Sequence, residues 1–120
     1  MRIIRIHNVR SGAVLGQAVQ LADGWWRRAV GLLGQAELPE GSGLLLVPCA
    51  SIHTLGMRFP VDVAFLDGRG RIVETRADMP PGHFAIGGKD VHATLELPVG
   101  TLAATDSRDG DTLSLEDARP

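Results

Sequence analysis

The sequence has one cysteine, one lysine and no tyrosine, and it contains no long hydrophobic run. The lone thiol of Cys49 excludes an intrachain disulfide and any Cys-x-x-Cys redox or zinc motif. No stretch approaches the roughly 18 apolar residues of a membrane-spanning helix, and no apolar signal segment follows Arg2 and Arg5. We therefore expect a cytoplasmic protein without a membrane partner.

Aromatic side chains are scarce, at 4% of the chain. Proteins that bind single-stranded nucleic acid stack the bases on aromatic side chains, so we expect no nucleic-acid partner. Phosphate-binding motifs are missing too, because Gly87-Gly88-Lys89 lacks the first half of a P-loop. The sequence therefore indicates no cofactor.

What is present fits one ordinary globular domain covering residues 1–120, with 44% hydrophobic and 22% charged residues. The charge is uneven along the chain. Residues 1–30 carry five Arg against Asp23, a net charge of +4, and residues 105–120 carry five acidic residues against two Arg, a net charge of −3. The two ends either mark an anionic partner or lie side by side and neutralise each other, and we favour the second interpretation.

Short β-branched and alternating runs predict about seven strands. They cover residues 2–7, 14–21, 44–47, 61–66, 71–75, 92–97 and 112–115. The first two runs predict one hairpin, and the Asp67-Gly68 turn predicts a second between residues 61–66 and 71–75. Residues 77–90 show no periodicity and predict a long loop.

One helix is expected at about residues 23–33. Asp23 suits the N-cap, an apolar stripe follows at helical spacing, and Gly34 suits the end. Together these elements predict an α+β fold: a mostly antiparallel β sheet or partial barrel with one short helix near residues 23–33.

The densest group of reactive side chains lies between Cys49 and Asp62. One interpretation is a thiol enzyme or small hydrolase, in which His53 activates Cys49 and Asp62 orients His53. Four residues of extended chain span about 13 Å, so only a bend would bring Cys49 and His53 together. A second interpretation is a metal held by Cys49 with His53, His83 and His92, although this spacing matches no known zinc motif.

The third interpretation is a binding pocket between residues 49–62 and the 78–90 loop. Asp62 and Glu96 each lie within an apolar strand, and a carboxylate that points inward needs a partner such as Arg28 or Arg58. The candidate binding residues are Arg28, His53, Met57, Asp62 and Glu96.

The order of several motifs resembles the Domain of Unknown Function 192 family over roughly residues 19–115. The motifs are Arg28-Ala-Val-Gly31-Leu32, Gly41-x-Gly43-Leu44-Leu45, Ile52-His53-Thr54-x-x-Met57-x-Phe59-Pro60-x-Asp62-Val63-x-Phe65-Leu66-Asp67, Leu95-Glu96-Leu97-Pro98-x-Gly100 and Gly110-Asp111. The resemblance implies a small α+β domain with a largely β core, and it implies no activity or catalytic residue. Many members carry a Trp-Met pair where this chain has His53-Thr54, which argues against a required role for His53.

We therefore expect a non-catalytic module that binds an unidentified small molecule or protein. The alternative is the enzyme that uses Cys49 and His53, with or without a metal. We favour the binding module because the candidate residues form no coherent catalytic set.

Overall fold

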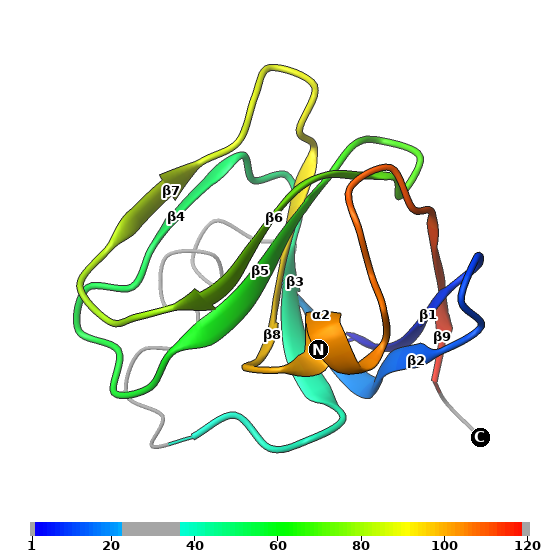
Figure 1. Ribbon diagram of the computed structural model, residues 1–120, viewed down its shortest axis with the longest axis horizontal. Coiled ribbons are helices and arrows are strands. Elements are labelled where there is room, and N and C mark those ends of the chain that lie inside the picture. Colours follow the sequence, from blue (N-terminus) through cyan, green and yellow to red (C-terminus); the bar gives the residue numbers. More distant parts are fainter. Residues whose placement is uncertain (1, 23–36, 119–120) are drawn as a thin grey trace.

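The computed structural model describes residues 2–22 and 37–118, which form a seven-stranded sheet, a two-stranded sheet and one short helix (Figure 1). The elements are β1 (Arg2–Asn8), β2 (Val14–Ala22), β3 (Ser42–Leu46), β4 (Ser51–His53), β5 (Val61–Leu66), β6 (Ile72–Met79), β7 (Phe84–Ile86), β8 (Ala93–Pro98), α2 (Thr101–Ala104) and β9 (Leu113–Asp117). The helix expected at residues 23–33 lies outside the described residues. Within the described ranges, no helix has the length and hydropathy needed to cross a bilayer.

The large sheet has the strand order β6-β5-β8-β3-β2-β1-β9. Its neighbours are antiparallel except β2 and β3, which run parallel. Parallel neighbours need a crossover connection of a dozen or more residues, and the chain between Ala22 and Ser42 is long enough for one. The sheet is therefore mixed rather than purely antiparallel, and the expected predominantly β, mostly antiparallel character is confirmed.

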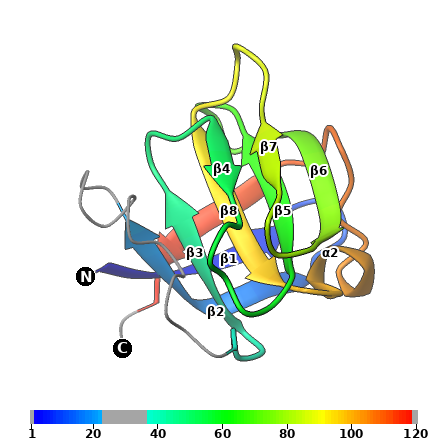
Figure 2. The ribbon, with the colours of Figure 1, turned by 90° about the vertical axis from the view of Figure 1, so that its left-hand side faces the viewer.

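The sheet curls into a half-barrel. Figure 2 shows β1, β2 and β9 running across the direction of β5 and β8. The two outermost strands come together at one point, where Arg71 and Thr112 form an isolated bridge. Two backbone hydrogen bonds support this closure, from Ile72 N to Asp111 O at 2.7 Å and from Leu113 N to Gly70 O at 2.9 Å. The outer edges of β6 and β9 are thus partly covered.

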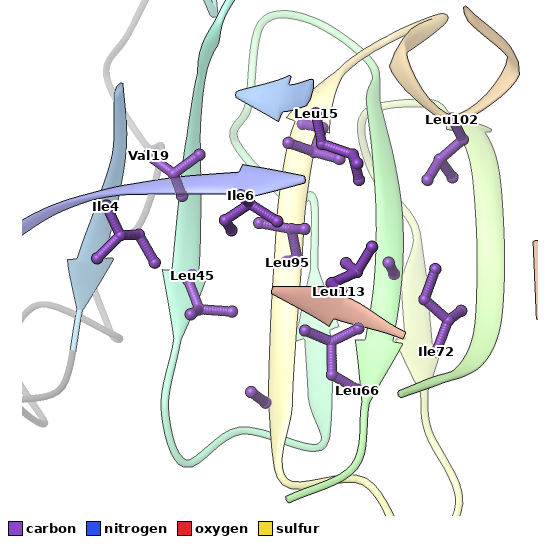
Figure 3. Close-up of a cluster of buried hydrophobic side chains, with 13 residues drawn as sticks. Ile4, Ile6, Leu15, Val19, Leu45, Leu66, Ile72, Leu95, Leu102 and Leu113 are labelled. Atoms are coloured by element: carbon purple, nitrogen blue, oxygen red, sulfur yellow. The ribbon is translucent and has the colours of Figure 1, made fainter. Parts of the chain in front are cut away.

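An inner cluster of aliphatic side chains fills the curl (Figure 3). All seven strands contribute to it, and Leu102 of α2 closes one end. The strand period of two places alternate residues of each strand inside. The buried members are Ile4, Ile6, Leu15, Val19, Leu45, Ala64, Leu66, Ile72, Ala93, Leu95, Leu97, Leu102 and Leu113.

An outer cluster lies on the opposite face of β3, β8 and β5, beneath the two-stranded sheet of β4 and β7. Its buried members are Ala22, Leu44, Leu46, Met57, Val61, Val63, Phe65, Met79 and Ala85. Because the central strands have apolar layers on both faces, β5 is buried at every position.

The oppositely charged ends of the chain lie side by side, as we favoured from the sequence. Strand β1 pairs with β9. Arg2 Nε contacts Asp117 Oδ1 at 2.8 Å, and Arg5 Nη1 contacts Glu116 Oε1 at 3.2 Å. The positive charges of Arg2 and Arg5 are therefore balanced within the fold.

Both predicted hairpins are confirmed, as β1 with β2 and as β5 with β6. The loop expected at residues 77–90 is wrong in part, because β6 continues to Met79 and β7 occupies Phe84–Ile86. Strand β4 and helix α2 were not predicted. Each has only three or four residues, too few to show a period.

Candidate functional site

Glu96 lies at the centre of the outer cluster. It stands on β8 opposite Leu44 of β3 and Val63 of β5. Residues directly opposite in antiparallel strands point to the same face of the sheet, so the Glu96 side chain lies among the apolar groups of that cluster. It is only 4% exposed.

The Glu96 carboxyl lacks compensation for this burial. Its Oε2 atom has no hydrogen-bond partner among the described residues. Loss of hydration favours the uncharged form, and burial alone raises the pKa of Glu96 to about 7. The group therefore changes charge close to neutral pH.

Among the described residues, the other two buried carboxylates show the usual arrangement. Asp62 and Asp111, which are 1% and 8% exposed, each accept several hydrogen bonds. Asp111 accepts from Asn8 Nδ2 at 3.0 Å and from Arg10 Nε at 2.8 Å, and these bonds hold the pKa of Asp111 well below its usual range. Glu96 is the exception, and an orphaned buried polar atom calls for a functional or structural explanation.

Asp62 holds one end of the half-barrel together. Its carboxylate accepts backbone N–H groups of Asp78 at 2.8 Å, Gly100 at 3.1 Å and Leu102 at 3.0 Å. These bonds join β5 to the end of β6 and to α2. The partner expected for Asp62 was an arginine such as Arg58, but the structure supplies backbone amides instead.

Asp62 and Glu96 do not line a common pocket. Asp62 stands opposite Leu97, an inner-cluster residue, whereas Glu96 stands opposite Val63 of the outer cluster. The two carboxylates therefore point to opposite faces of the sheet, which corrects the single pocket expected from the sequence. Arg28 lies outside the described residues.

The segments expected to cover the pocket do meet over the outer face. Met57 and Ala85 are buried there, and Ile52 packs against them. Thr54, fully buried, joins the two segments because its Oγ1 donates to Pro80 O at 2.6 Å and accepts from His83 N at 2.8 Å. Sequence reasoning missed Thr54, because its neighbours His53 and Leu55 are exposed and no local pattern marks a buried hydroxyl there.

A second hydroxyl group, on Thr94, holds the start of the segment that covers the outer face. Thr94 Oγ1 donates to Cys49 O at 3.0 Å. Thr94 stands two residues before Glu96 on β8, so it points to the same face. The backbone at Cys49 is therefore anchored beside the Glu96 position.

The Cys49, His53 and Asp62 triad is not assembled. The Cys49 thiol donates to Ser51 O at 3.0 Å, and exposed His53 lies beside Phe84 with a ring-centroid distance of 6.0 Å. The Asp62 carboxylate is occupied by backbone amides on the other face. Within residues 2–22 and 37–118, no three His, Cys, Asp or Glu side chains gather as a metal ion would require. Cys49, His53, His83 and His92 thus do not form the set considered from the sequence.

Comparisons with known proteins agree with this fold. The model of the DUF192 family, described as "Uncharacterized ACR", matches residues 6–115. No curated protein matches the chain.

Two solved structures are similar, each at 22% identity. A protein of unknown function from Novosphingobium aromaticivorans DSM 12444 has a TM-score of 0.80, covering 93% of this chain and 83% of its own. A protein of Sinorhizobium meliloti 1021, described as a "putative transcription regulator", has a TM-score of 0.81, covering 94% and 92%. At this identity the likeness shows the fold alone.

Proposed function

Since this chain belongs to the DUF192 family, whose description assigns no activity, we propose that it is a ligand-binding module rather than an enzyme. The proposed anchor is Glu96, whose side chain points to the outer face of β3, β8 and β5. The observation that carries this proposal is the buried Oε2 atom of Glu96, which has no partner among the described residues.

A donor on the ligand would supply the missing compensation. Leaving a buried acceptor unpaired costs about 1–3 kcal/mol, and a charged partner forms a stronger bond than a neutral one. The surroundings of Glu96 are apolar, with Leu44 and Val63 directly opposite. The ligand class is therefore a small molecule with an apolar body and an amine, amide or hydroxyl group that donates to the carboxylate.

Nucleic acid is a poorer candidate, although one structural relative is described as a "putative transcription regulator". Phosphate binding needs exposed cationic groups that are free to displace counterions. In the described part of the chain, Arg2, Arg5 and Arg10 each contact a carboxylate of residues 106–117. These internal pairs oppose a basic surface at this end of the molecule.

Native mass spectrometry of the protein as purified provides the first test. Wild type is compared with Glu96→Gln and Glu96→Leu, and Glu40→Gln serves as a control at an exposed carboxyl. We expect wild type and the control to carry an extra mass that denaturation removes, and both Glu96 variants to have the bare mass.

A probe series covers a ligand that is lost during purification. Benzylamine and benzamide carry a donor on an apolar body. Benzoate carries an anion that the Glu96 carboxylate repels at pH 8, where the carboxylate is ionised, and the series is therefore run at that pH. We expect the first two to raise the melting temperature of wild type and not of Glu96→Leu, and benzoate to have no effect. Bare wild-type mass together with equal responses of both proteins to all three probes would refute the proposal.

A further inference from the structure

A pocket opens at the end of the half-barrel opposite α2. Figure 3 shows Leu102 at one end of the inner cluster and Leu66 toward the other. At the Leu66 end, the described residues line a pocket of about 220 Å³. It lies on the inner face of the sheet and is therefore separate from Glu96, which points to the outer face.

The floor of this pocket is apolar. Ile4, Leu45, Leu66 and Ala93 belong to the inner cluster, and Leu115 of β9 completes the wall. The mouth of a small β-barrel is a common place for a ligand, where apolar walls bind the body and a few polar groups orient it. The floor continues directly into the hydrophobic core, so it favours an apolar ligand over water.

The volume sets the size of the occupant. A water molecule occupies about 30 Å³ in the liquid, so the pocket has the volume of roughly seven waters. For comparison, an apolar cavity of about 150 Å³ in another protein binds benzene. A pocket of about 220 Å³ therefore suits one fused two-ring system.

Two carboxylates on the rim, Asp67 and Glu116, supply hydrogen-bond acceptors. Asp67 Oδ1 accepts the backbone N–H groups of Arg71 at 3.0 Å and Arg69 at 2.9 Å, and these bonds hold the pKa of Asp67 below its usual range. Both bonds end at Oδ1, so Oδ2 can still accept a donor. Glu116, also on the rim, contacts Arg5. Arg2 and His92 also line the pocket, and Arg2 contacts Asp117 at 2.8 Å. With the Arg2 charge already paired, the rim carboxylates favour an uncharged ligand that donates and disfavour an anion.

We propose that the open end of the half-barrel binds an uncharged two-ring aromatic molecule of indole size, which places its rings on the Leu45–Leu66 floor and donates one N–H or O–H to the Asp67 rim. This site is independent of the one at Glu96, and either can fail without the other.

Saturation-transfer NMR with indole tests the site, and indole-3-acetate serves as the anionic comparison. We expect indole to receive saturation from wild-type protein and indole-3-acetate to bind at least about fivefold more weakly, because its carboxylate meets Asp67 and Glu116.

Three variants locate the binding. Ala93→Leu fills the floor, and Leu115→Asp places a charge on the wall. Val73→Asp is the matched control, since Val73 is 38% and Leu115 40% exposed, both lie on outermost strands, and Val73 does not line the pocket.

We expect the indole signal to fall at least about fivefold in both pocket variants and to persist in Val73→Asp. If Ala93→Leu does not fold, Leu115→Asp alone tests whether indole binds in this pocket. Leu115 is partly exposed, so this variant is expected to fold. No saturation transfer to indole from wild type, or equal signals from wild type and Leu115→Asp, would overturn the proposal.

Discussion

Replacing Glu96 by Gln is expected to remove a pH dependence from the stability of this protein. Burial raises the pKa of Glu96 to about 7, from 4.5 for an ordinary glutamate. The folded state therefore holds the proton more tightly than the unfolded state. Stability from this group is fully present below pH 4.5, falls as pH rises, and is lost above pH 7. Glutamine has no proton to lose, so the variant lacks this slope.

The size of the effect follows from the two pKa values. One pKa unit corresponds to about 1.4 kcal/mol, so the whole shift amounts to about 3 kcal/mol. Between pH 5 and pH 8, the unfolding free energy of wild type should fall by about 2.5 kcal/mol relative to Glu96→Gln. That is a large share of the 5–15 kcal/mol typical of a small domain.

Urea unfolding of both proteins at half-unit steps from pH 4.5 to pH 8.5 measures this difference. Subtracting one curve from the other cancels the remaining titratable groups, because they are common to both proteins. A constant difference across the range would show that Glu96 keeps an ordinary pKa and is hydrated or paired in solution. Such a result would also remove the basis for Glu96 as a ligand anchor.

Three further changes test the framework. Asp62→Ala should lower the unfolding free energy by at least about 3 kcal/mol in urea titrations, because three backbone N–H groups lose their acceptor. Asp111→Asn should flatten the acid side of the stability profile, since the lowered pKa of Asp111 gives stability that is present at neutral pH and lost as pH falls below about 4. Gly43→Ala should lower the melting temperature, since a Cβ there would lie 2.8 Å from the backbone O of Glu96. Gly88→Ala, where a Cβ meets nothing within 4 Å, should change it little.

Local patterns predicted the strands and hairpins well. Runs such as residues 61–66 combine β-branched side chains with the Asp67-Gly68 turn, and both signals come from neighbours in sequence. The charge imbalance predicted the pairing of the two ends, because opposite charges in one small domain gain by lying together. These inferences needed no knowledge of the tertiary fold.

Features that depend on long-range register were not predictable in this way. Asp62 and Glu96 look alike in the sequence, each a carboxylate between apolar residues. Their opposite orientations follow from the pairing of Asp62 with Leu97, which is set across 35 positions of chain. A one-residue shift of β5 against β8 would place both carboxylates on the same face. The parallel arrangement of β2 and β3 likewise depends on where the intervening chain runs.

The pairing of β1 with β9 has a consequence for how the chain is made. Residues of β1 leave the ribosome before the other strands of the sheet, while their partners at Leu113–Asp117 come about 100 residues later. At 5–20 residues per second, this interval is on the order of 5–20 s. During that time β1 has only β2 beside it, so one edge with Ile4 and Ile6 stays open to other chains. Synthesis of the last strand is therefore the event that protects the first, and slow translation of the final third should favour aggregation of the nascent protein.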